Sequence, residues 1–138
     1  MKTINATKGE FVNLINGLFQ VQNLKGKEFG LIVSKNLTTL EEKLKHLEKE
    51  GKPSPEFMEL AEKVNKLANT EDEKTAKKKI DELEKENKEL VADRRAQMDR
   101  VTELMKDKMS IKLSTLSEDL LPDDITALQI GSIKKIIE

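Results

Sequence analysis

One stretch of the chain, residues 70–109, most limits the folds that are open to it. Positions on one stripe recur there at spacings of three and four residues, and they are Ala76, Ile80, Leu83, Asn87, Leu90, Arg94, Met98, Val101 and Met105. A period near 3.5 residues is typical of a helix that lies along partner helices. Thr70 and Glu73 have the spacing of a capping box, and no Pro or Gly follows them before Pro122. We therefore expect one long helix, about 57 Å at 1.5 Å per residue, which must kink or project from a domain of this size.

Polar residues interrupt the stripe of this long helix. Asn87 and Arg94 fall on it, and a strict heptad also includes Gln97, whereas a four-residue stutter after Arg94 brings in Met98 instead. A polar residue on a core stripe costs stability, and it either fixes the register of the helices or belongs to a site. We favour the register interpretation and keep the site as the alternative.

The first predicted helix is neutral, although 37% of the residues in the chain are charged. It begins after Thr7, which forms a second capping box with Glu10, and residues 11–24 carry no charge. Apolar and amide side chains cover more than one of its faces, so the helix is either the centre of a bundle or an oligomer interface. The residues expected at such an interface are Phe11, Val12, Leu18 and Phe19.

The next elements follow from turn residues and periodicity. Gly26 separates the first helix from a second one over residues 27–50, so that residues 1–50 form a helical hairpin. Pro55, at a first helical position, starts a short helix that occupies residues 54–69 and precedes the long helix.

The last segment, residues 110–138, begins with apolar and polar residues in alternation, as in a strand. The only extended partner for it is residues 2–5, so we expect a small two-stranded β ribbon that joins the two ends of the chain. A short apolar helix over residues 125–137 follows, and we expect it to dock. The predicted fold is mainly α: one helical domain over residues 1–138, in which the hairpin and the long helix form a bundle completed by the ribbon and the C-terminal helix.

Composition argues against several classes of function. The chain has 25 basic and 26 acidic residues and a net charge of −1, so it lacks the basic excess of a nucleic-acid-binding protein. It has no cysteine, and its only histidine, His46, lies among charged residues, so we expect no catalytic set, no metal site and no cofactor. We also find no signal peptide and no membrane-spanning run, and we expect a non-enzymatic protein of the cytoplasm with no membrane partner.

Polar side chains on otherwise apolar or neutral faces are the candidates for a binding site. Amide and guanidinium groups recognise carbonyls and phosphates through directed hydrogen bonds. If the hairpin packs against the long helix, such groups could converge on a pocket for a small anionic ligand. They are Lys35 and Asn36 from the second helix, and Asn87, Arg94, Arg95 and Gln97 from the long helix. The alternative, which we favour for the set as a whole, is that they cap turns, fix register and face water.

Short motifs give the chain a resemblance to a known group of proteins. They are MKTIN at the start, NLINGL at residues 13–18, and KGKEFGLIVSKNL at residues 25–37, with its Lys35-Asn36 pair. Together with a charged helical middle and an apolar end, they make the chain similar to small helical proteins of tailed phages and prophages of Gram-positive bacteria. The resemblance implies a phage setting, and so the host cytoplasm, but no mechanism, because this family has no assigned activity.

Two functional hypotheses from different classes follow. The first is a non-enzymatic, homo-oligomeric binding module that engages a host factor or sequesters a small anionic, nucleotide-like ligand, as an anti-defence protein would. The second is a structural or assembly protein, such as a scaffold or chaperone for phage parts. A DNA-binding adaptor ranks third because the charges balance.

Overall fold

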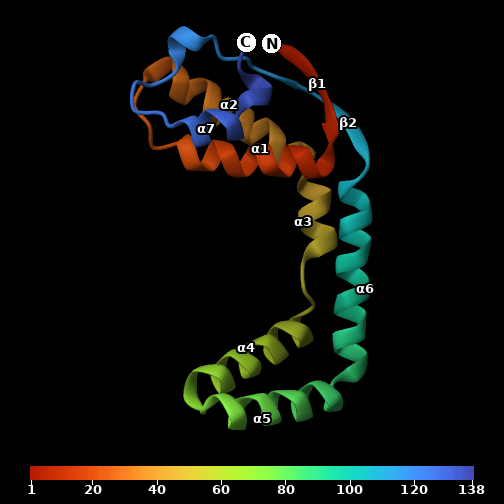
Figure 1. The fold of residues 1–138 in the computed structure, drawn as a ribbon. Coiled ribbons are helices and arrows are strands. Elements are labelled where there is room, and N and C mark those ends of the chain that lie inside the picture. The colour runs from red at the N-terminus through yellow and green to blue at the C-terminus, as the bar shows by residue number, and fades with distance from the viewer. The chain divides into compact units, whose positions relative to one another are not determined.

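The computed structural model describes residues 1–138 and is mainly helical (Figure 1). The two strands are β1 (Lys2–Thr7) and β2 (Lys108–Leu113). The α-helices are α1 (Lys8–Val21), α2 (Lys27–Lys43), α3 (Lys45–Gly51), α4 (Pro55–Thr70), α5 (Glu73–Glu86), α6 (Lys88–Met105) and α7 (Ala127–Ser132). Two 3₁₀ turns, Glu118–Leu120 and Lys134–Ile136, complete the secondary structure.

The residues group into two compact units. Unit 1 consists of Met1–Glu48 and Glu103–Glu138, and unit 2 consists of Lys49–Thr102. The single domain expected from the sequence therefore contains two structural units, and each is described by itself below.

The ribbon of unit 1 confirms the predicted pairing of the two ends of the chain. β1 and β2 are antiparallel, with Lys2 opposite Leu113 and Thr7 opposite Lys108, so the first strand runs two residues further than expected. Side chains along each strand alternate between buried and exposed, the pattern of a sheet with one face on the core and one in water. Figure 1 shows the two termini close together at the free end of this ribbon.

The helical hairpin of unit 1 is also present, and Thr7 starts it as predicted. The Thr7 hydroxyl oxygen accepts a hydrogen bond from the Glu10 N–H at 3.1 Å, which satisfies one of the free donors at the start of α1. Gly26, with a φ of 130°, makes the turn into α2, a conformation that favours glycine. The second predicted helix is not continuous, because the backbone leaves helical geometry at Leu44 and divides it into α2 and α3.

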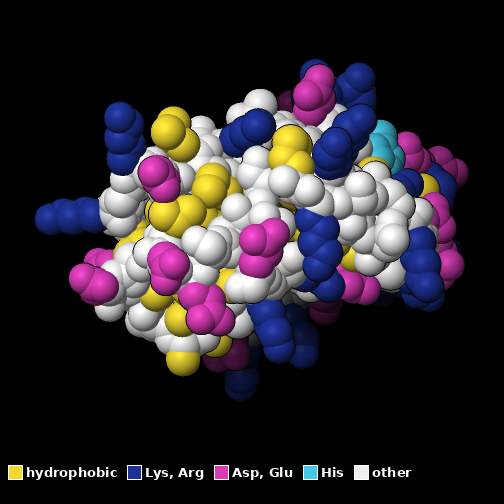
Figure 2. All heavy atoms as spheres, turned by 90° about the horizontal axis from the view of Figure 1, so that it is seen from above, with side chains coloured by type: hydrophobic (Ala, Val, Ile, Leu, Met, Phe, Trp, Pro, Cys, Tyr) yellow, Lys and Arg dark blue, Asp and Glu magenta, His cyan; other side chains and the backbone are white.

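Unit 1 holds the well-buried core of the protein. The large side chains that are fully buried all belong to it, and they are Phe11, Leu14, Leu18, Val21, Phe29, Val33, Leu40, Ile111, Leu113, Leu116, Ile133 and Ile136. The C-terminal segment docks as expected, because the Leu116 N–H donates to the Ile136 oxygen at 2.7 Å and the Glu138 N–H donates to the Leu116 oxygen at 2.8 Å. On the face drawn in Figure 2, basic and acidic side chains are both scattered, with hydrophobic side chains between them.

In unit 2, α4 forms where the sequence places it. The Ser54 hydroxyl oxygen accepts from the Phe57 N–H at 3.2 Å, and Pro55 occupies the first turn. α4 packs against α5, to which Glu71 and Asp72 connect it. None of the helices in either unit combines the length and the apolar composition that a membrane crossing requires.

The long helix expected over residues 70–109 is kinked, one of the two outcomes that its length allowed, but it begins and ends at other residues than predicted. Thr70 belongs to the last turn of α4, and the cap of α5 is Asp72, whose carboxylate accepts from the Thr75 N–H at 2.7 Å. The chain then bends at Asn87, between α5 and α6 (Figure 1). There the backbone N–H and the side-chain Nδ2 of Asn87 both donate to the Leu83 oxygen, at 3.1 and 2.9 Å. An asparagine side chain that competes for the helical carbonyl in this way favours a helix end.

Candidate functional site

The apolar stripe of the α4–α5 hairpin in unit 2 is only partly covered. Its buried members are Leu60, 5% exposed, and Ala76, 6% exposed. The other apolar side chains of the stripe are partly exposed, and they are Phe57, Ala61, Val64, Leu67, Ile80 and Leu83. An amphipathic helix gains most of its stability by packing such a stripe away from water. The hairpin therefore presents an apolar surface that its own two helices do not close.

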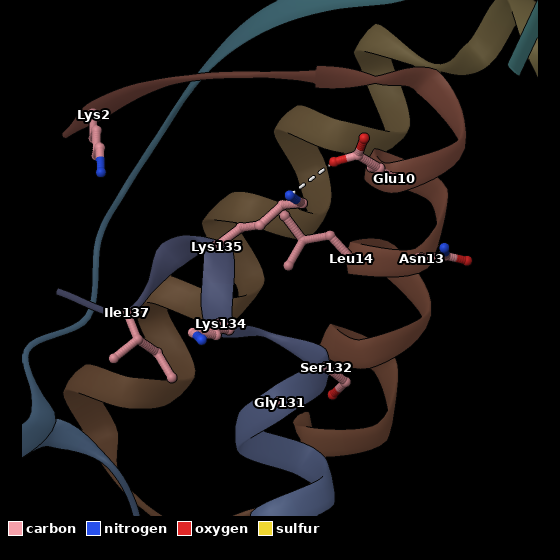
Figure 3. Close-up of a pocket in the computed structure, with 9 residues that line it drawn as sticks. All are labelled: Lys2, Glu10, Asn13, Leu14, Gly131, Ser132, Lys134, Lys135 and Ile137. Atoms are coloured by element: carbon pink, nitrogen blue, oxygen red, sulfur yellow. Dashed lines mark ion pairs between the residues drawn. The ribbon is translucent and has the colours of Figure 1, made fainter. Parts of the chain in front are cut away.

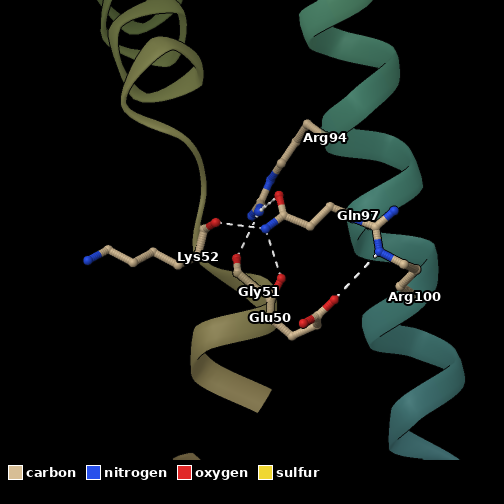
Figure 4. Close-up of polar contacts among 6 residues, drawn as sticks. All are labelled: Glu50, Gly51, Lys52, Arg94, Gln97 and Arg100. Atoms are coloured by element: carbon tan, nitrogen blue, oxygen red, sulfur yellow. Dashed lines mark hydrogen bonds and ion pairs between the residues drawn. The ribbon is translucent and has the colours of Figure 1, made fainter. Parts of the chain in front are cut away.

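Two of the predicted ligand-binding residues, Arg94 and Gln97, form a polar clasp beside this hairpin (Figure 4). One guanidinium nitrogen of Arg94 donates to the Gly51 oxygen at 2.8 Å and to Gln97 Oε1 at 2.9 Å. The Gln97 amide nitrogen donates to the Glu50 oxygen at 2.8 Å and to the Lys52 oxygen at 2.7 Å. These carbonyls lie at the C-terminal end of α3, where backbone oxygens lack helical partners and a positive charge is favoured.

The clasp has apolar and ionic support from its neighbours. The Arg94 guanidinium lies over the Phe57 ring, 5.6 Å from its centre, and the Arg100 Nε is 3.6 Å from the Glu50 carboxylate. Only a small hollow of 190 Å³ remains beside Arg94. The geometry therefore gives Arg94 and Gln97 a structural role, which agrees with the register interpretation of these two residues.

The other predicted ligand-binding residues take no part in the hydrogen bonds of this clasp. Lys35 is exposed on α2 of unit 1. The amide group of Asn87 donates a hydrogen bond to the Leu83 oxygen at the end of α5. Arg95 lines an open hollow at the α5–α6 bend, together with charged residues and the apolar side chains of Val91 and Ala92. No hydrogen bond joins Asn87 or Arg95 to the Arg94–Gln97 pair, so of the four predicted residues in unit 2 the structure brings only these two together.

Asn36 is the one fully buried polar side chain in the molecule, at 1% exposure, and its partner is backbone. Its Nδ2 donates to the Ser114 oxygen at 2.8 Å, and its Oδ1 accepts from the Ser114 N–H at 2.9 Å. Both polar groups of the side chain are thus occupied in fixing the chain just after β2. In this structure Asn36 is not free to contact a ligand, contrary to the hypothesis from the sequence.

The predicted oligomer interface on α1 is only partly available. Phe11 and Leu18 are fully buried in the core of unit 1, which corrects their assignment to an interface. Val12 packs against that core, and Phe19 remains 41% exposed. The uncharged helix is therefore the centre of unit 1, the first of the two interpretations that its sequence allowed.

Unit 1 contains a hollow that inspection of the sequence did not single out. It has a volume of 680 Å³, and its lining includes Lys2 from β1, Lys134 and Lys135 from the C-terminal turn, and Glu10 and Asn13 from α1 (Figure 3). Lys135 Nζ lies 2.8 Å from the Glu10 carboxylate, and this cation holds the pKa of Glu10 below its usual range. The predicted joining of the two chain ends was the one signal that could have placed Lys2 near the C-terminal lysines.

Comparison with known proteins adds no further constraint. No family model, no curated protein and no solved structure matches the chain. In addition, no three His, Asp or Glu side chains lie close enough together to hold a metal ion.

Proposed function

We propose that this chain is a non-enzymatic protein-binding module that docks through the apolar stripe of the α4–α5 hairpin. The observation that carries the proposal is the contrast between the two units: the large, fully buried side chains all lie in unit 1, whereas in the hairpin only Leu60 and Ala76 are buried and neither completely. Covering apolar surface contributes about 25 cal/mol for each Å² removed from water, against which the entropic cost of association is set. A partner helix laid along the stripe would supply that burial.

The charged side chains around the stripe fit the same role. Lys and Glu residues keep an unoccupied hairpin in solution, and a ring of polar groups around an apolar strip is the usual anatomy of a protein interface. In the phage setting that the resemblance implies, the partner would be a host factor or another phage component, as in an assembly scaffold. The binding mode is the same for both, so the hairpin stripe is the feature to test first.

Site-specific photo-crosslinking tests this proposal. A photoreactive amino acid replaces Met58, which is 54% exposed beside Phe57 at the edge of the stripe, in the full-length chain inside expressing cells. The matched control replaces Lys66, which is exposed on the side of α4 opposite the stripe. We expect adducts between the chain and a polypeptide, whether a second copy or another protein, from the Met58 position and not from Lys66. Equal labelling from both positions, or none from either, would contradict docking through the stripe.

A second candidate function, the binding of a small phosphate-bearing ligand, is favoured by the hollow in unit 1. Lys2 and Lys134 line it without an ion pair in the chain, and the apolar side chains of Leu14 and Ile137 form part of its wall. Two free ammonium groups beside an apolar wall suit an anion that carries an organic group. None of the six ligand-binding residues predicted from the sequence lines this hollow.

Titration with inorganic pyrophosphate, followed through the backbone amide resonances of unit 1, tests this second function. Shifts that centre on the hollow and disappear in a Lys2→Ala, Lys134→Ala variant would support it. Lys112→Ala, an exposed lysine of β2 outside the hollow, is the control. If that control variant lost the shifts to the same extent, the effect would be one of general charge and the site would be excluded.

A further inference from the structure

We infer that the occupant of the hairpin stripe is a second copy of this chain, with the two α5 helices side by side and antiparallel about a two-fold axis between Ile80 and Asp81. This inference rests on the proposed function, because it names the partner of the same surface. The observation that carries it is the distribution of charge along α5. This is independent of the apolar stripe, because the charged residues lie outside it.

The two halves of α5 carry opposite charge. Residues 73–79 contain four lysines and one glutamate, a net charge of +3, and residues 80–86 contain four carboxylates and one lysine, a net charge of −3. When two such helices lie antiparallel, each basic half meets the acidic half of the other copy. When they lie parallel, like charges meet, and this is unfavourable. The helix is therefore complementary to itself in one orientation only.

The pairing can be followed residue by residue along one flank of α5. Glu73, Lys77 and Glu84 are spaced by four and seven residues, so they follow one side of the helix. About an axis between Ile80 and Asp81, Lys77 falls opposite Glu84 of the other copy. This pair occurs twice in the dimer, as a two-fold interface requires.

This flank is free within the chain, whereas the other flank of α5 is in use. Lys79, on that other side, is 2.7 Å from the Glu71 carboxylate in the α4–α5 turn. None of the three residues of the free flank takes part in an ion pair within the chain.

The arrangement also closes the apolar stripe. Two helical hairpins that pair about a two-fold axis form a four-helix bundle, in which the inward residues of each helix face the bundle axis. The partly exposed side chains Ile80 and Leu83 of α5, and Val64 and Leu67 of α4, would lie there. A different protein as the partner would need an apolar face, but it would give no reason for α5 to be complementary to itself.

Charge reversal of one pair tests the inference, with sedimentation equilibrium of the full-length chain as the measurement. We expect the wild-type chain to be a dimer, and Lys77→Glu or Glu84→Lys alone to raise the dissociation constant roughly tenfold, since each turns two attractions into repulsions. The variant with both changes should dimerise like the wild type. Lys66→Glu, which reverses a charge away from the interface, is the control, and circular dichroism confirms that every variant is helical.

The orientation has its own test, because the chain has no cysteine and a single introduced one is the only thiol. With a short bis-maleimide reagent, Asp81→Cys beside the axis should link two copies. Glu73→Cys should not, because in the antiparallel pair the two copies of residue 73 lie about 22 Å apart along the helix axes. Linking at both positions would show parallel helices and overturn the inference.

The remaining outcomes separate this inference from the proposed function. A monomeric wild-type chain, or single reversals without effect, overturns the self-pairing. If Met58 crosslinks to another polypeptide in that case, docking through the stripe survives with a different partner. If Met58 crosslinks to nothing, both proposals fail.

Discussion

The buried amide of Asn36 gives the sharpest test of how unit 1 is held together. Its two hydrogen bonds to the Ser114 backbone, at 2.8 and 2.9 Å, join α2 to the end of β2. Replacement by aspartate keeps the shape of the side chain but changes what it can donate. A neutral carboxyl can donate to the Ser114 oxygen and accept from its N–H, whereas a carboxylate must point an unprotonated oxygen at that carbonyl.

The sign of the pH dependence follows from this geometry. In the Asn36→Asp variant, burial and the facing carbonyl raise the pKa of the introduced carboxyl above its value in the unfolded chain. Such a group leaves the protein most stable below about pH 4, the unfolded pKa, and stability is lost as the pH rises to the folded pKa. The loss is about 1.4 kcal/mol for each pH unit between the two pKa values. Asn36→Ala should instead cost about 2–4 kcal/mol at every pH, because it leaves both polar groups of Ser114 without a partner.

Amide hydrogen exchange at Ser114, measured by NMR, reports these changes within unit 1. The chain has no tryptophan or tyrosine, so far-ultraviolet circular dichroism in a urea series is the matching global measurement. Lys35→Asp, which introduces the same carboxyl at the exposed neighbouring position, is the control and should show little pH dependence. If Asn36→Asp were equally destabilised at pH 4 and pH 8, or Asn36→Ala cost less than about 0.5 kcal/mol, the reasoning about this amide would be refuted.

Three further predictions concern other contacts. Gly17→Ala should destabilise unit 1 by about 1–3 kcal/mol in thermal melts, because its Cβ would lie 2.7 Å from a backbone oxygen of α7, whereas Gly131→Ala, with open space around it, should do no harm. Gln97→Ala should cost about 1–2 kcal/mol and speed amide exchange after α3, while the exposed Arg95→Ala should leave both unchanged. The lowered pKa of Glu10 means that its lysine contact stabilises the fold above about pH 4.3 and is lost on acidification. Glu10→Gln should therefore weaken the acid dependence of unfolding, and an unchanged profile would count against that contact.

The parts of the fold that the sequence predicted are those that depend on local signals. Each of these signals needs only a few neighbouring residues. They are the Thr7 and Ser54 caps, the turn at Gly26, and the alternation of apolar and polar residues up to Leu113. The ribbon needed one further step, and it succeeded because the chain offers only one other extended segment. The predicted start of α5 was wrong because residues 70–73 contain two possible caps. The choice between Thr70 and Asp72 depends on where α4 ends.

The candidate site was harder to predict because its polar side chains form hydrogen bonds with backbone groups that are distant in the sequence. Asn36 looked available because its partner, the main chain of Ser114, lies 78 residues away and has no side-chain signal. Arg94 and Gln97 were candidates for ligand binding for the same reason. Their partners are backbone carbonyls of Glu50, Gly51 and Lys52, which leave no side-chain signal in the sequence. Sequence patterns show that a polar residue lies on an apolar stripe, but not which carbonyl it meets there.

The period of the long stripe does not show to which chain the neighbouring helices belong. A repeat near 3.5 residues requires helices alongside, but it is the same whether those helices belong to one chain or to two. In this chain α4 supplies only part of the cover, and Ile80 and Leu83 remain partly exposed. By mass action, a partner that covers them stabilises unit 2 by a free energy that grows with the logarithm of the partner's concentration above its dissociation constant. A stripe that is incomplete in one copy, next to a helix whose two halves carry opposite charge, is therefore understood most simply as half of a symmetric interface.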